Sequence, residues 1–146
     1  MSHTYSSILI HAVYSTKRRE PVLTNRELRI RLHQYMGGVL KHNGAQPLGI
    51  NGVEDHIHMV FGMPPSLDVA RLIKETKRST SIWLKSQDSG LAHFGWQRGY
   101  GAFSVSKGKL RNVRQYIADQ EQHHRKITFD DEWKSLLRIY GLDQNQ

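Results

Sequence analysis

The order of strand-like and helix-like hydrophobic patterns along the sequence constrains the fold of this chain more than any other feature. Apolar residues alternate or run together in short segments typical of β-strands, and they recur at helical spacing in longer ones. Strand patterns cover residues 7–15, 48–53, 56–62 and 101–106, and helical patterns cover 24–44, 66–88 and 109–125. This order predicts an α+β fold, a ferredoxin-like split βαβ antiparallel sheet with an added C-terminal helix that carries Tyr116.

Length and composition limit what kind of protein this is. The 146 residues suit a single domain spanning 1–146, and 38% hydrophobic with 23% charged residues is typical of a folded chain. Apolar runs such as 8–10 and 59–61 are far shorter than the ~20 residues that cross a bilayer, and no basic-then-apolar leader opens the chain. With no cysteine, disulfides, zinc fingers and thiol nucleophiles are excluded. We expect a protein of the reducing cytoplasm without a membrane span.

Positive charge is concentrated in one stretch. The chain has 21 Lys and Arg against 13 Asp and Glu, and residues 71–114 hold ten of the basic residues but only two of the acidic ones. Such a concentration indicates a polyanion partner such as nucleic acid, although a basic surface that merely aids solubility is the alternative. The candidate contacts to a DNA backbone are Arg71, Lys74, Arg78, Lys85, Lys107, Lys109, Arg111 and Arg114.

Two pairs of residues could carry chemistry. His56 and His58 project from the same face of a strand, roughly 7 Å apart, and two imidazoles there can converge on a divalent ion. Tyr116 and Gln120 are four apart on a helix, which places a phenol beside an amide. Taken singly, each pair has a plainer interpretation, as structural histidines or as a tyrosine ring packed between helices.

Together the two pairs are more specific. A His-apolar-His strand and a Tyr-x-x-x-Gln helix, in a small basic α+β chain, resemble the single-tyrosine HUH transposases of the insertion-sequence 200/605 type. The stretches that carry the resemblance are 11–17 (HAVYSTK), 55–58 (DHIH), 99–106 (GYGAFSVS) and 116–124 (YIADQEQHH).

The resemblance implies roles for individual residues. It makes His56, His58 and Gln120 the ligands of a divalent metal, Mg²⁺ or Mn²⁺, and Tyr116 the nucleophile. Family members cut and rejoin single-stranded DNA at hairpin-bearing element ends through a 5′-phosphotyrosine intermediate. They are homodimers in which the tyrosine helix of one subunit can complete the active site of the other.

Other histidines and other functions stay open at this point. We expect His11, within an apolar strand, to support the metal ligands, and His123 or His124 to lie near the metal, near phosphate, or at a helix C-terminus. Residues 129–140 predict a short helix, and 144–146 should be frayed. The alternative functions are a non-catalytic single-stranded nucleic-acid binding module and a domesticated relative that processes chromosomal repeats.

Overall fold

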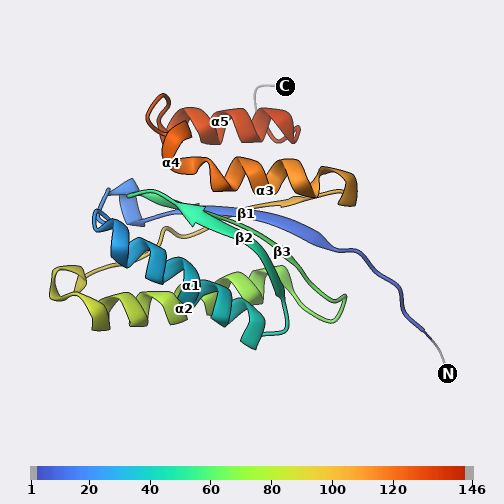
Figure 1. Ribbon diagram of the computed structural model, residues 1–146, viewed down its shortest axis with the longest axis horizontal. Helices are drawn as coiled ribbons and strands as arrows, with labels where there is room; N and C mark the ends of the chain where they lie inside the picture. The colour runs from blue at the N-terminus through green and yellow to red at the C-terminus, as the bar shows by residue number, and fades with distance from the viewer. Residues whose placement is uncertain (1–2, 144–146) are drawn as a thin grey trace.

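The computed structural model describes residues 3–143, and its centre is one antiparallel sheet (Figure 1). The strands lie in the order β2-β3-β1-β4, and each neighbouring pair is antiparallel. This is the order of a split βαβ fold, so the predicted ferredoxin-like sheet is confirmed. The strands are β1 (Leu9–Ser15), β2 (Gln46–Gly52), β3 (His56–Gly62) and β4 (Gly101–Ser104).

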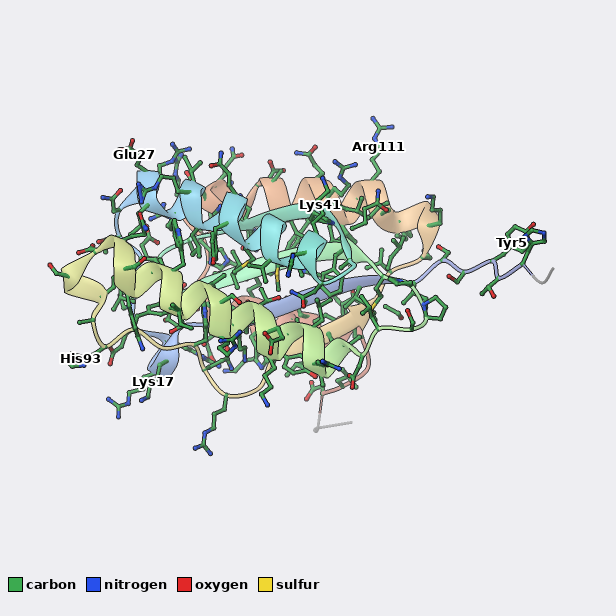
Figure 2. All side chains as sticks on the ribbon, turned by 90° about the horizontal axis from the view of Figure 1, so that it is seen from below. Tyr5, Lys17, Glu27, Lys41, His93 and Arg111 are labelled. Carbon is green, nitrogen blue, oxygen red and sulfur yellow. The ribbon has the colours of Figure 1, made fainter. Side chains whose placement is uncertain are left out.

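Helices cover both faces of the sheet. Helices α1 and α2 lie on one face, and α3 to α5 lie on the other (Figure 1). Figure 2 looks onto the first of these layers and shows α1 and α2 side by side. The helices are α1 (Arg26–His42), α2 (Val69–Gln87), α3 (Leu110–Ala118), α4 (Gln120–His123) and α5 (Phe129–Ile139).

The two long helices begin later than their sequence patterns indicate. The side chain of Asn25 accepts a hydrogen bond from the backbone N–H of Leu28, and that of Asp68 accepts one from Ala70. These N-caps fix the first turns at residues 26 and 69, because a side-chain oxygen satisfies a backbone donor that the helix leaves free.

The layer under α1 and α2 holds the main hydrophobic core. Alternation along β3 points Ile57, Met59 and Phe61 into it, and all three are buried. They pack against apolar side chains of the two helices such as Met36 and Leu84. This side of the sheet is therefore built from apolar groups.

The opposite face of the same strands carries His56, His58 and Val60. Helix α3 packs there through Ile117, in a cluster with Val60. Helix α5 packs through Phe129 and Leu136 against Val13 and Phe103, so Phe103 belongs to the core. The space between this face and helices α3 to α5 contains the functional side chains.

The prediction of one long helix over 109–125 is wrong. Helix α3 ends at Ala118, and Asp119 leaves helical geometry with φ −92° and ψ 13°. The amide of Asn51 on β2 donates to the carbonyls of Ile117 and Ala118 at 3.0 and 3.1 Å, which competes with continuation of the helix. The break starts a new short helix, α4, at Gln120.

The C-terminal helix expected over 129–140 is present as α5. The frayed end expected at 144–146 lies outside the described residues. Between residues 3 and 143, no helix is long and apolar enough to cross a membrane.

Candidate active site

A buried carboxylate lies at the centre of the space between the sheet and helices α3 to α5. We call this space the polar layer. Glu132 projects from α5 toward the sheet and is only 1% exposed. Its Oε1 lies 3.0 Å from Nε2 of His56, 3.0 Å from Nε2 of His58 and 2.9 Å from Nε2 of His124. Three imidazoles thus converge on one carboxylate oxygen.

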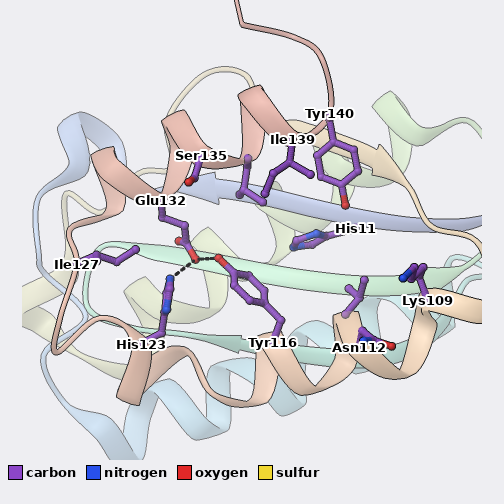
Figure 3. Close-up of a pocket in the computed structure, with 12 residues that line it drawn as sticks. His11, Lys109, Asn112, Tyr116, His123, Ile127, Glu132, Ser135, Ile139 and Tyr140 are labelled. Carbon is purple, nitrogen blue, oxygen red and sulfur yellow. Dashed lines mark hydrogen bonds and ion pairs between the residues drawn. The ribbon is translucent and has the colours of Figure 1, made fainter.

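The other oxygen of Glu132 faces the tyrosine. The Tyr116 hydroxyl donates a hydrogen bond to Oε2 (Figure 3). The Gln120 amide donates to the same oxygen at 3.1 Å. The Nε2 of His123 lies 3.6 Å from Oε2. One side chain therefore contacts both the histidines and the tyrosine.

The residues singled out in the sequence come together within one chain. His56 and His58 are fully buried on the same face of β3, with ring centroids 5.2 Å apart. The Oε1 of Gln120 lies 3.2 Å from Nε2 of His56, and the Tyr116 ring centroid lies 5.7 Å from that of His58. The four-residue spacing of Tyr116 and Gln120 survives the helix break between them, because the break falls at Asp119.

A second set of contacts orients the histidine rings. The Nδ1 of His58 lies 2.9 Å from Nε2 of His11, so His11 supports the histidine pair as we expected. The Nδ1 of His56 lies 2.7 Å from the Asp55 carboxylate, and Nδ1 of His124 lies 3.0 Å from the carbonyl of Ile127. Such contacts fix which ring nitrogen faces the centre of the site.

Burial and hydrogen bonding shift the pKa values of several side chains in the site. Burial lowers the pKa of His11 to about 3 and that of His58 to about 4. Burial opposes ionisation of Glu132, but hydrogen bonds to the surrounding histidines outweigh it and hold the pKa of Glu132 well below its usual range. Burial and the hydrogen bond to Glu132 raise the pKa of Tyr116. At neutral pH the site therefore pairs an ionised carboxylate with a protonated phenol.

The donor set fits a divalent metal ion. One donor atom each from His56, His58, His124 and Glu132 lies within 4.8 Å of the others. Imidazole nitrogens and carboxylate oxygens are the usual protein ligands of divalent transition ions. These buried donors form a candidate metal centre beside Tyr116.

A cavity of about 470 Å³ reaches the tyrosine between α3 and α5 (Figure 3). Its polar lining includes Tyr116, Glu132, Lys109 and Asn112, and its apolar lining includes Leu136. Its size is in the range of small-ligand pockets. Tyr116 and Glu132 therefore line a cavity large enough for a small ligand.

The basic residues fall into two groups on opposite faces of the sheet. One group lies on α2, in the layer away from Tyr116, and consists of Arg71, Lys74, Arg78 and Lys85. The other lies at the start of α3, in the same layer as Tyr116, and consists of Lys107, Lys109, Arg111 and Arg114. All eight are exposed, so the single basic stretch of the sequence becomes two separate surfaces.

Sequence reasoning missed Glu132. Acidic residues in a first helical turn are common because they interact well with the helix dipole, and Asp130 and Asp131 share that position. The available signal was its place on the apolar stripe, three residues after Phe129 and four before Leu136. A carboxylate on a stripe that packs into a core requires a buried partner.

Comparisons with known proteins agree with this architecture. A crystal structure from Deinococcus radiodurans assigned as a transposase matches with a TM-score of 0.64 and 20% identity, covering 82% of this chain and 95% of that chain. A REP-associated tyrosine transposase bound to a REP hairpin matches with a TM-score of 0.59 and 18% identity, covering 85% of this chain and 74% of that chain. Among curated proteins, none matches.

The family model described as "Transposase IS200 like" matches residues 4–120. That segment includes the whole sheet, the histidine pair, Tyr116 and Gln120, and it ends before Glu132. The chain therefore belongs to the family of IS200-like transposases.

Proposed function

We propose that this protein cuts and rejoins single-stranded DNA next to hairpins, with Tyr116 as the nucleophile and a divalent metal ion, Mg²⁺ or Mn²⁺, as cofactor. The observation that carries the proposal is the meeting of Tyr116 and the His56–His58 pair on the two oxygens of Glu132. The proposed nucleophile and the candidate metal centre thus contact the same carboxylate.

The chemistry is an exchange of phosphodiester bonds. The phenol oxygen of Tyr116 attacks phosphorus, the bond from phosphorus to the 3′-oxygen breaks, and a 5′-phosphotyrosine forms. Glu132 Oε2 orients the phenol by accepting its hydrogen bond, the phenol proton is released to solvent as the bond to phosphorus forms, and the leaving 3′-oxygen takes a proton from solvent. The reverse step joins the 5′-phosphate to a new 3′-hydroxyl without ATP, because the covalent bond to Tyr116 conserves the energy of the cut bond.

We assign the metal to His56, His58 and Gln120, as the family resemblance implies. When bound, a divalent ion polarises a non-bridging oxygen of the scissile phosphate and so offsets the charge that develops during attack. This help matters because burial and Glu132 raise the pKa of Tyr116, which makes the phenol a poor nucleophile on its own.

Hairpin DNA is the substrate we propose. The REP-associated relative is bound to a REP hairpin, and the family resemblance implies hairpins at element ends. Lys109 lines the cavity beside Tyr116 and would contact the backbone of the strand that enters the site. Arg111 and Arg114 lie on the helix of Tyr116 but line a second pocket, where they would contact the DNA that flanks the cut.

A homodimer with shared sites is implied by the same resemblance and stays a prediction, as does a cytoplasmic location. In the single chain described, Tyr116 and His58 both contact Glu132, so a site completed in cis is the alternative to the shared one. Mixing Tyr116→Phe protein with His56→Ala protein tests this. Restored cleavage would mean that tyrosine and metal come from different subunits, whereas no rescue in verified mixed dimers would support the cis site.

The proposal is tested by incubating the protein with a 5′- or 3′-labelled single-stranded hairpin oligonucleotide and Mg²⁺ or Mn²⁺. We expect a protein–DNA adduct that survives denaturation and disappears in EDTA. Binding without any adduct, across both metals, would contradict the enzyme and support a non-catalytic binding module. The label that stays with the protein also reports the polarity of the bond to tyrosine.

A further inference from the structure

We infer that Glu132 and His124 are ligands of the metal, so that the metal centre of this protein draws on residues beyond the segment that the family model matches. The inference rests on the proposed function only in treating His56 and His58 as a metal site. Both added donors follow residue 120, where the family match ends. They come from the end of α4 and from α5.

The spacing of the donor atoms is the first argument. Glu132 Oε1 lies 2.9–3.0 Å from the Nε2 atoms of His56, His58 and His124. Neighbouring ligands at ~2.1 Å from an octahedral ion are separated by about 3 Å. Glu132 Oε1 is thus as close to each imidazole nitrogen as two donors that share one ion, and all four donor atoms lie within 4.8 Å of one another.

The orientation of the rings is the second argument. The Asp55 carboxylate accepts a hydrogen bond from Nδ1 of His56, which leaves Nε2 as the ring atom that faces the centre of the site. The carbonyl of Ile127 accepts one from Nδ1 of His124 and leaves its Nε2 facing the same point. Histidines that bind metals are held in this way, with the second ring nitrogen on an acceptor.

The closeness of the rings is the third argument. The ring centroids of His56 and His124 are 4.4 Å apart, and those of His56 and His58 are 5.2 Å apart. Three imidazoles this close together can share one divalent ion with Glu132.

The donor set also indicates the class of ion. Three imidazole nitrogens and one carboxylate favour borderline transition ions over Mg²⁺, which prefers oxygen ligands and keeps several waters. We expect the affinity of the site to follow that preference, with Mn²⁺ or Co²⁺ bound more tightly than Mg²⁺.

The experiment measures metal binding without DNA. Mn²⁺ is titrated into the EDTA-stripped full-length protein and followed by calorimetry and by electron paramagnetic resonance. Glu132→Gln and His124→Asn should each weaken Mn²⁺ binding by about 10- to 100-fold. Asp131→Asn, which removes an exposed carboxylate from the same turn of α5, should bind like the wild-type protein.

Pulsed resonance on the wild-type protein gives a readout that needs no variant. We expect the bound Mn²⁺ to couple to three histidine nitrogens, from His56, His58 and His124. Coupling to two nitrogens, together with unchanged affinity in both variants, would overturn the inference and leave the metal on His56, His58 and Gln120. Failure of the wild-type protein to bind any divalent ion would instead contradict the metal in the proposed function.

Discussion

The two faces of the sheet are formed by the same strands but carry different kinds of side chain. On β3, Ile57 and Met59 face α1 and α2 among apolar side chains, while His56 and His58 face α3 to α5 around a carboxylate. All four are buried to a similar degree. Neighbouring residues of one strand therefore separate the part of the protein that stabilises the fold from the part that we assign to chemistry.

The difference has an energetic side. Burying an aliphatic side chain such as Met59 contributes about 1.5–3 kcal/mol to folding. Burying polar groups costs free energy unless each is paired. In the polar layer, the hydrogen bonds around Glu132 offset that cost. A substitution on the apolar face should thus change stability, and one on the polar face should change activity.

The largest effect should come from the nucleophile. Tyr116→Phe removes one hydroxyl and should lower adduct formation by about 1,000-fold or more, while hairpin binding persists because the ring stays in place. Tyr35→Phe is the matched control, since Tyr35 lies on α1, on the other side of the sheet, where its exposed ring stacks on Trp83. Gel analysis of denatured adducts and a binding titration measure the two properties, and equal adduct yields in the two variants would call for another nucleophile.

A pair of adjacent substitutions tests the two faces directly. His58→Ala should lower cleavage by about 100-fold or more, because it removes a proposed metal ligand. Met59→Ala should lower the free energy of unfolding by about 2–5 kcal/mol and leave the specific activity of the folded protein unchanged. Urea denaturation and cleavage assays on both variants check this, and the comparison fails if Met59→Ala impairs catalysis as strongly as His58→Ala.

Charge reversal compares the two basic surfaces. Lys109→Glu with Arg111→Glu, on the layer of Tyr116, should weaken hairpin binding on the order of 10-fold and reduce the salt slope by about 0.7 for each phosphate that the variant no longer neutralises. Lys74→Glu with Arg78→Glu, on α2, should have a smaller effect because α2 lies on the opposite face of the sheet. A larger effect from the α2 pair would place the DNA there.

The smallest effect concerns pH. The pKa of His11 is lowered from 6.5 to about 3 by burial, so below pH 6.5 the unfolded chain binds a proton that the folded chain does not. The contribution of neutral His11 to stability is complete above pH 6.5 and falls by about 1 kcal/mol per pH unit as the pH drops toward 3. Urea unfolding in EDTA between pH 7.5 and 5 should show this fall, and His11→Asn should reduce it. Identical pH profiles of the wild-type protein and His11→Asn would show that His11 is not the group responsible for the fall.

Local patterns were enough to predict the sheet and half of the site. Alternation placed His56 and His58 on one face of a strand, and four-residue spacing placed Tyr116 beside Gln120. The end of α3 could not be predicted in this way, because Asn51, which competes for its last carbonyls, comes from a distant strand.

The role of Glu132 also depends on tertiary packing. Three acidic residues begin α5, and only the docking of that helix on Val13 and Phe103 turns one of them into the site. The division of the basic stretch between two faces has the same origin. Charge along the sequence carries no information about which side of a sheet a helix covers.

The most direct test of the account is to identify the residue that carries DNA. After reaction with a hairpin oligonucleotide and a divalent metal, the adduct is digested with nuclease and protease and its peptides are analysed by mass spectrometry. We predict a nucleotide attached through a 5′-phosphate to the peptide that contains Tyr116. A nucleotide on any other side chain, or a cleaved strand with no attached protein, would contradict the account.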